Sequence, residues 1–191
     1  VGEDTPTNDR GAVELAHGLK PLPAALSFHL NYKPEKDWDK CEERDVVVFD
    51  MFESSEADFA KCAGLGAMTL CYFSSQYEDW RPDSADFGGL GPALDEWAGE
   101  RWVDPDDANN LELMKRRLDL AVERGCDGID LDNVDRKGHE DYVIEIFKEA
   151  RDRGLYVSQK NAIEKIELFW DYVDLYQNEQ CQELDECQAY E

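Results

Sequence analysis

The chain has 191 residues, a length that suits one domain, and 42% of them are hydrophobic, which is enough to build a substantial core. Its 45 acidic and 20 basic residues give a formal net charge of −25 at pH 7. A surface this negative repels phosphate backbones and attracts cations, so the composition argues against nucleic acid as a partner and is compatible with a cationic polymer. A solvated, highly soluble exterior is the alternative interpretation of the same charge.

Prolines interrupt the first 24 residues at Pro6, Pro21 and Pro23, and no periodicity is sustained there. We therefore expect an irregular N-terminal arm over residues 1–24 and one domain over residues 25–191. The chain starts at Val1 rather than methionine, and no segment approaches the roughly 18 apolar residues that span a bilayer. These features predict a processed, secreted or lumenal protein without a membrane span.

Apolar, β-rich runs alternate with helical segments along the rest of the chain. Strands are predicted at residues 25–32, 45–52, 67–73, 101–103, 126–132, 155–160 and 173–178. Helices are predicted at 57–65, 109–124, 139–152 and 162–170, with caps at Ser54 or Ser55 and at Asp106 or Asp107. This alternation is typical of parallel β-α units, in either a doubly wound sheet or a (β/α) barrel.

Polar residues gather where the predicted strands end, and this pattern favours the barrel, because barrel enzymes assemble their sites at that edge. The polar ends are Asp50, residues 74–79, residues 130–135, Lys160 with Asn161, and residues 178–180. The glycine-rich stretch 88–91 follows no predicted strand, so we expect a turn there rather than a phosphate loop. We predict an α/β, TIM-like (β/α) barrel with about seven strands, the eighth being missing or replaced.

The segment Gly128-Ile129-Asp130-Leu131-Asp132 carries two carboxylates on one strand. A two-residue period turns Asp130 and Asp132 toward the barrel axis and Ile129 and Leu131 toward the helices. Two like charges in a confined space are costly unless one is protonated or offset by a cation, so the pair suggests acid, base or nucleophile chemistry. A Ca²⁺ site that includes Asp127 and Asp135 is the alternative, although the glycine and distal glutamate of the common calcium loop are lacking. Catalysis without a metal or other cofactor is the favoured hypothesis.

Lys160 has the same inward parity and is predicted to lie near these acids, either to tune their pKa values or as a structural salt bridge. The same count on the last strand turns Val173 and Leu175 outward, so Glu179 is expected to reach the site only where that strand ends or bulges. Tyr72 and Tyr77, like Trp80 and Tyr176, lie beside polar strand ends, where rings can stack on sugars.

The six cysteines lack the paired spacing of a zinc site. Cys181 and Cys187 are close enough in sequence to close a short loop, and Cys41 and Cys62 flank a predicted strand and helix. Disulfides are therefore expected at these two pairs. Cys71 and Cys126 lie in apolar strands and are predicted to be buried free thiols.

At these residues the chain resembles glycoside hydrolase family 114, the endo-α-1,4-polygalactosaminidases, from about residue 45 to residue 187. The segments that carry the resemblance are 48–53, 71–74 with 77–82, 125–130 with 132–135, 160–161, and 178–181 with 185–187. The resemblance implies a TIM-like barrel that hydrolyses an α-1,4-linked, partly deacetylated galactosamine polymer, a cationic carbohydrate. It implies a catalytic pair formed by Asp130 or Asp132 with Glu179. Asp50, Tyr72, Tyr77, Lys160, Asn161 and Asn178 are the predicted substrate-binding residues.

The chain departs from this family in its first strand, where members usually carry a tryptophan and this chain has Leu26-Ser27-Phe28-His29-Leu30. The loops at Ser75-Gln76 and after Asp135 are shorter than the family pattern, and the chain ends before the expected eighth strand. These departures support an alternative function, in which a catalytically degenerate barrel binds glycans or serves as a structural module of an extracellular assembly. Turnover of an amino-sugar polymer distinguishes the two hypotheses.

Overall fold

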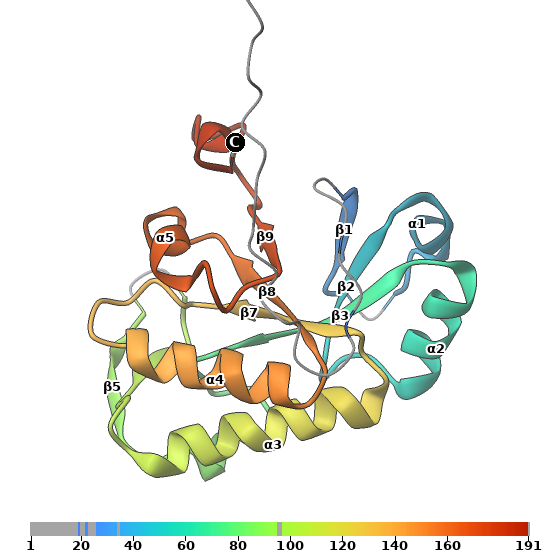
Figure 1. The fold of residues 1–191 in the computed structure, drawn as a ribbon. Coiled ribbons are helices and arrows are strands. Elements are labelled where there is room, and N and C mark those ends of the chain that lie inside the picture. The colour runs from blue at the N-terminus through green and yellow to red at the C-terminus, as the bar shows by residue number, and fades with distance from the viewer. Residues whose placement is uncertain (1–18, 20–21, 23–25, 34, 95–96, 191) are drawn as a thin grey trace, which may run out of the picture.

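The computed structural model describes residues 19, 22, 26–33, 35–94 and 97–190, so most of the expected arm at 1–24 lies outside the described residues. The main sheet contains six parallel strands in the order β1-β2-β3-β7-β8-β9. Their bounds are β1 (Phe28–Asn31), β2 (Val46–Asp50), β3 (Met68–Ser74), β7 (Gly128–Asp132), β8 (Tyr156–Lys160) and β9 (Leu175–Gln177). The sheet curls as half of a barrel, with β1 and β9 at its two edges (Figure 1), and the predicted TIM-like α/β fold is confirmed.

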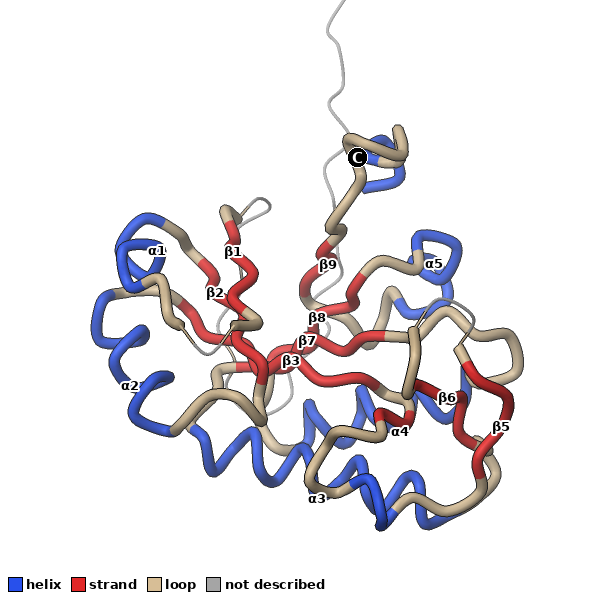
Figure 2. The backbone as a smooth tube through the Cα atoms, turned by 180° about the vertical axis from the view of Figure 1, so that it is seen from behind, coloured by secondary structure: helices blue, strands red, loops and turns tan. Residues whose placement is uncertain are grey.

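Helices cover the outer, convex face of this sheet (Figure 2). They are α1 (Trp38–Glu43), α2 (Glu56–Leu65), α3 (Ala108–Arg124), α4 (Glu140–Asp152) and the short α5 (Ile166–Phe169). The helices predicted at 57–65, 109–124 and 139–152 are confirmed to within one residue at each end. The helix predicted at 162–170 is wrong in part, because a 3₁₀ turn at Ile163–Lys165 precedes α5. None of the helices in the described ranges is long and apolar enough to cross a bilayer.

The helix caps that the sequence predicts are present in the structure. Ser55 Oγ accepts the backbone N–H of Asp58, and the Asp58 carboxylate accepts the N–H of Ser55, which is a reciprocal capping box at the start of α2. Helix α3 starts at the N-cap Asp107 and ends at Gly125, whose φ of 78° is in the left-handed region that glycine adopts at little cost. These caps fix where the helices begin and end against the sheet.

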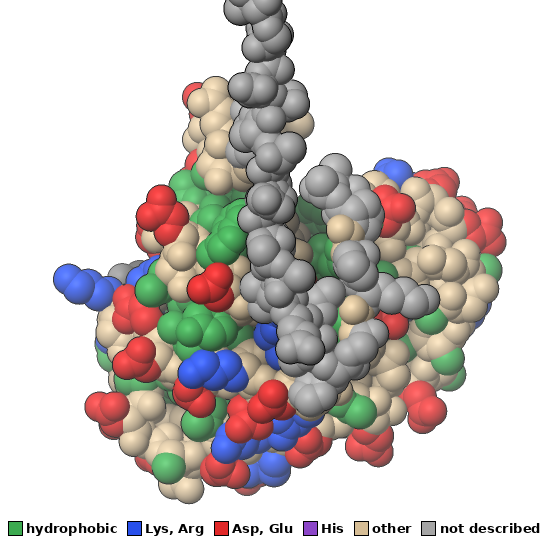
Figure 3. Space-filling view, viewed as in Figure 1, with side chains coloured by type: hydrophobic (Ala, Val, Ile, Leu, Met, Phe, Trp, Pro, Cys, Tyr) green, Lys and Arg blue, Asp and Glu red, His purple; other side chains and the backbone are tan. Residues whose placement is uncertain are grey.

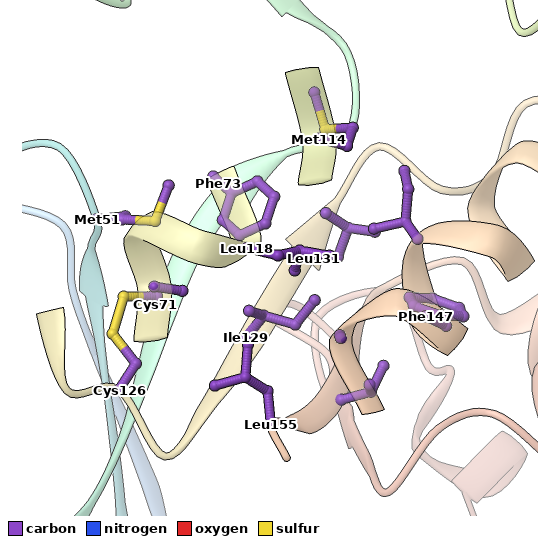
Figure 4. Packing of buried hydrophobic residues seen from close by; sticks show 14 of the residues in the cluster. Met51, Cys71, Phe73, Met114, Leu118, Cys126, Ile129, Leu131, Phe147 and Leu155 are labelled. Atoms are coloured by element: carbon purple, nitrogen blue, oxygen red, sulfur yellow. A yellow bond between two sulfur atoms is a disulfide. The ribbon is translucent and has the colours of Figure 1, made fainter. Parts of the chain in front are cut away.

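The main hydrophobic core lies between the sheet and helices α3 and α4. Ile129 and Leu131 of β7 are fully buried there, against Leu118 of α3 and Phe147 of α4 (Figure 4). A smaller apolar cluster of Val46, Val48 and Leu70 lies on the other face of the sheet. Because Ile129 and Leu131 face the helices, Asp130 and Asp132 point to the inside of the half-barrel, as predicted.

The strand predicted at 101–103 does not join the barrel. It forms β6 (Glu100–Val103), which pairs antiparallel with β4 (Tyr77–Glu78) and β5 (Leu90–Ala93) in a separate sheet of three strands. The predicted count of seven barrel strands is therefore wrong by one, and the turn expected at 88–91 runs into β5. The connection between β5 and β6 is too short for the crossover that parallel pairing requires, so these strands form an antiparallel pair.

All six cysteines form disulfides. The bonds Cys41–Cys62 and Cys181–Cys187 confirm the two expected pairs. The prediction of free thiols at Cys71 and Cys126 is wrong, because these residues are bonded with their Cα atoms 5.9 Å apart. β3 and β7 are neighbours in the sheet although 55 residues separate the two cysteines, and sequence alone does not show that adjacency.

Candidate active site

Strand β7 brings Asp132 to the barrel mouth, by which we mean the edge where the parallel strands end. Its Oδ2 accepts hydrogen bonds from Lys160 Nζ at 2.9 Å and from Tyr72 OH at 2.8 Å. Its Oδ1 accepts the backbone N–H of Asn133 at 2.9 Å. Three donors from β3, β8 and the turn after β7 therefore hold this carboxylate in one orientation.

Lys160, the last residue of β8, joins Asp132 to Glu179. Its Nζ lies 2.9 Å from Asp132 Oδ2 and 2.9 Å from Glu179 Oε2, so these two oxygens are at most 5.8 Å apart, twice 2.9 Å. Burial of the ammonium opposes its charge, but the two carboxylates outweigh that effect and raise the pKa of Lys160 above its usual value. The lysine thus remains charged and holds two acids from distant segments in one place.

Glu179 reaches the site beyond the end of β9, which stops at Gln177, and this is one of the two routes that the sequence allowed. Val173 packs in the outer core as expected, but Leu175 packs with the inner cluster and pairs with Ser158, so the predicted outward parity of Leu175 is wrong. The cause is Asp174, whose side-chain Oδ2 accepts the N–H of Val157 and interrupts the regular alternation. Counted inward from Leu175, Glu179 falls on the inner face, so its carboxylate is directed to Lys160 without a bulge at the strand end.

Asp130 lies deeper than Asp132 and is fully buried. One oxygen accepts the hydroxyl of Ser158 at 2.6 Å, and Oδ2 has no hydrogen-bond partner. Burial raises the pKa of Asp130 to about 7, although the Ser158 hydrogen bond and the charge of Lys160 act in the other direction. The structure therefore separates the two acids of β7: one is exposed to the mouth and the other is enclosed beneath it.

A pocket of about 200 Å³ opens beside these acids. Its lining residues are Asp132, Asn133, Val134, Asp135, Lys160, Asn161, Ala162 and Glu164. Asn161 also holds the segment that carries Glu179, because its Oδ1 accepts the Glu179 N–H at 3.1 Å. The predicted residues Tyr72, Asp132, Lys160, Asn161 and Glu179 thus come together around one site.

Asp50 lies at the same end of the sheet, but its oxygens are already occupied. Both bind the guanidinium of Arg81 at 2.9 Å, and Oδ1 also accepts the N–H groups of Phe52 and Glu53. Arg81 also binds Glu78 through two hydrogen bonds of 2.8 and 3.0 Å. Asp50 therefore braces the wall of the mouth, and it is buried.

Two further residues that the sequence predicted for substrate binding, Tyr77 and Asn178, do not line the pocket. Tyr77 packs against the hydrophobic core, with its ring 5.4 Å from that of Phe87. Asn178 donates to Tyr190 OH and Glu186 in the C-terminal turn. The structure thus directs Tyr77 and Asn178 to packing and turn contacts rather than to the pocket.

Glu100 of β6 is a site neighbour that sequence reasoning missed. It is only 8% exposed, and its Oε2 accepts a hydrogen bond from Asn133 Nδ2 at 3.2 Å. Burial, with the charges of Glu78 and Asp132, raises its pKa to about 7. No motif marked this residue, because its proximity depends on the antiparallel sheet that the sequence did not predict.

The alternative interpretation of the aspartates near β7 was a calcium site. Within the described ranges, no group of three or more His, Cys, Asp or Glu side chains is arranged to hold a metal ion. Asp127, one member of the alternative calcium site, lies at the opposite end of β7 and accepts the Thr69 N–H. The geometry therefore does not assemble the four aspartates of that alternative.

Comparison with known proteins places these features in context. The family model described as "Glycoside-hydrolase family GH114" matches residues 12–191. The structure is similar to Ega3 of Aspergillus fumigatus, solved in complex with galactosamine, with a TM-score of 0.78 and 29% identity over 91% of this chain and 76% of that one. The glycoside hydrolase domain of PelA from Pseudomonas aeruginosa has a TM-score of 0.70 at 16% identity, over 81% and 67% of the two chains. No curated protein sequence matches.

Proposed function

Because the chain belongs to glycoside hydrolase family GH114, we propose that it is an endo-acting hydrolase of α-1,4-linked, galactosamine-containing polysaccharide. The observation that carries this proposal is the pair of carboxylates, Asp132 and Glu179, that Lys160 holds together at the barrel mouth. Paired carboxylates flanking the scissile bond are the usual machinery of glycoside hydrolysis.

We assign the nucleophile to Asp132 and the acid/base to Glu179. Asp132 is fixed by three donors and lines the pocket, as an attacking group requires. The Glu179 side chain is 33% exposed, so it can exchange protons with solvent and with a leaving group. Asp130 is enclosed and does not line the pocket, which favours a supporting role beneath Lys160.

The separation of the two acids supports a retaining mechanism. Their facing oxygens lie within 5.8 Å, twice the 2.9 Å to Lys160 Nζ, and this bound includes the separation of about 5–5.5 Å that is usual in retaining enzymes. In the first step Asp132 forms a bond to the anomeric carbon while the glycosidic bond breaks and Glu179 protonates the departing oxygen. In the second step Glu179 takes a proton from water, whose oxygen bonds to that carbon and releases Asp132.

A cationic amino sugar is the substrate that the charge of the molecule favours. The net charge is −25, and Asp135 and Glu164 line the pocket together with Asp132. The similar Ega3 was solved with galactosamine bound, which agrees with an ammonium-bearing sugar. Three disulfides also favour an oxidising compartment, so we propose that the enzyme acts outside the cell.

The test is a panel of defined polymers incubated with the purified protein. We expect new reducing ends from partly deacetylated α-1,4-galactosamine polymer, fewer from the fully N-acetylated form, and none from β-1,4-linked glucosamine polymer. Release from the middle of the chain lowers the mean polymer length before monomer accumulates, which distinguishes endo from exo action. Binding of the galactosamine polymer without turnover would reject the hydrolase and favour the glycan-binding alternative.

A further inference from the structure

Glu100 is a buried carboxylate that does not stabilise the sheet to which it belongs. It lies directly opposite Glu78 in the antiparallel pair of β4 and β6, where two like charges are destabilising. Arg81 neutralises Glu78 with two hydrogen bonds, whereas Glu100 forms no ion pair with any described residue. The side chain of Glu100 instead accepts a hydrogen bond from Asn133, the residue that follows Asp132.

Strand β6 holds Asn133 through both its side chain and its carbonyl group. The Asn133 amide donates one hydrogen to Glu100 Oε2 at 3.2 Å and the other to Ser74 Oγ at 2.9 Å. The Asn133 carbonyl accepts Gln76 Nε2 at 3.3 Å, and Gln76 in turn accepts the N–H of Val103 at 3.0 Å. Strand β6 therefore contacts Asn133 directly through Glu100 and indirectly, through Gln76, from Val103.

These contacts hold Asn133 in an uncommon backbone conformation. Its φ is 58°, in the left-handed region that few residues other than glycine adopt, although asparagine tolerates it. In this conformation its N–H points to Asp132 Oδ1 at 2.9 Å and fixes the plane of that carboxylate. The Asn133 carbonyl also accepts Ser75 Oγ at 2.9 Å, so loss of the Glu100 contact loosens the side chain of Asn133 while other bonds keep the residue in place. The donor that Asn133 presents to Asp132 then becomes less well fixed.

We propose that Glu100 is a positioning residue for Asp132 that acts through the side chain of Asn133. The inference rests on the proposed function, since it assumes that Asp132 attacks the sugar. A reacting group displaced by about 1 Å can lower the rate by about a hundredfold, so a tether of this kind has a measurable effect on kcat. It also gives the β4-β6-β5 sheet a role in the chemistry, because that sheet supplies Glu100.

Two substitutions of Glu100 distinguish the effect of its hydrogen-bond acceptor from the effect of its charge. Glu100→Met keeps a similar length but removes the acceptor, and we expect kcat on the galactosamine polymer to fall about tenfold or more, with KM within about twofold. Glu100→Gln keeps an acceptor oxygen, and we expect it to retain kcat within about threefold. Glu123→Met, the same change at an exposed position of α3, is the matched control.

A double-mutant cycle tests whether the effect passes through Asn133. Asn133→Gly allows the same φ but has no side chain to hold, so we expect a kcat loss similar to that of Glu100→Met. The double variant should lose no more than Asn133→Gly alone, because both changes break one linkage. Full kcat in Glu100→Met, a loss confined to KM, or additive losses in the double variant would each overturn the proposal.

An NMR measurement without substrate tests the contact between Glu100 and Asn133 independently of hydrolase activity. In the wild type, the NMR signals of the Asn133 side-chain amide should shift with pH around a midpoint near 7, the pKa of Glu100 set by burial, Glu78 and Asp132 against Arg81. In Glu100→Gln the part of this titration that comes from Glu100 should be lost, and what remains is the smaller shift from Asp130, whose pKa is also about 7. A titration of unchanged amplitude would refute the tether. If the wild type lacks turnover but shows the titration, the hydrolase fails while the contact stands.

Discussion

Asp130 and Asp132 are two residues apart on one strand, and their surroundings give them different properties. Asp132 has three donors and faces the pocket, whereas Asp130 is enclosed with a single hydroxyl partner. Burial raises the pKa of Asp130 to about 7, so this carboxyl is largely protonated below that pH in the folded protein. In the unfolded chain the same group ionises near pH 4.

This difference predicts a stability change in Asp130→Asn that depends on pH. The folded state binds more protons than the unfolded state between about pH 4 and pH 7, so the contribution of Asp130 to stability declines as the pH rises through this window. Asparagine does not titrate and can still accept the Ser158 hydroxyl. Relative to wild type, the variant should gain on the order of 2 kcal/mol in free energy of unfolding between pH 5 and pH 8.

Urea denaturation at the two pH values measures this difference. Glu100 and the other titrating groups are present in both proteins, so the difference between the proteins reports Asp130 together with its coupling to Lys160, Asp132 and Glu179. The same difference between variant and wild type at pH 5 and pH 8 would show that Asp130 is already ionised in the folded state at pH 5.

At the residue scale the sequence predicted much of the site. Alternation placed Asp130, Asp132 and Lys160 on one inner face, because β7 and β8 are regular and the outward Ile129, Leu131 and Val157 are buried in the core. It gave the wrong face for Leu175, next to Asp174, whose side chain accepts the N–H of Val157, but Glu179 reaches the site past the strand end as expected. The sequence also gave no sign of Glu100, because its partner Asn133 lies 33 residues away in the chain.

At the scale of elements, the predictions succeeded where a local signal marks an end. The box formed by Ser55 and Asp58 starts α2, and Asp107 and Gly125 bound α3. The antiparallel sheet escaped prediction because β4 has only two residues and β5 contains Gly91 and Pro92, which lack strand periodicity. Pairing between such short segments is set by the fold around them.

The N-cap of α3 gives an element-scale prediction. Asp107 accepts the N–H of Asn109 at 3.0 Å and, with its other oxygen, the N–H of Gly89 at 2.7 Å. Asp107→Ala leaves both donors without this acceptor and should lower the free energy of unfolding by about 1–2 kcal/mol. The neighbouring Asp106→Ala, whose side chain is exposed, should change it by less than about 0.5 kcal/mol. Equal effects in chemical denaturation would show that Asp107 does not cap the helix.

At the scale of the whole molecule, acidic side chains outnumber basic ones by 45 to 20, and the face in Figure 3 shows both kinds mixed over the surface. A long cationic polymer is therefore attracted by the molecule as a whole as well as by the mouth. Salt screens this attraction over distances of about 10 Å at 0.1 M, so the proposed substrate should bind less tightly as ionic strength rises.

Calorimetric titration of Glu179→Gln with galactosamine oligomers measures this effect without turnover. Between about 50 and 500 mM NaCl we expect the affinity to fall about tenfold or more, while that of a neutral N-acetylated oligomer changes little. An affinity for the cationic oligomer that does not respond to salt would show that net charge plays no part in recognition.

The central claim is that Asp132 and Glu179, held by Lys160, hydrolyse the polymer. The most direct measurement is the initial rate of reducing-end release from partly deacetylated α-1,4-galactosamine polymer by the wild type and by Glu179→Gln. We expect turnover by the wild type, a loss of about a thousandfold in Glu179→Gln, and an unchanged rate in Glu183→Gln, an exposed control nearby. Wild-type activity that persists in Glu179→Gln would contradict it.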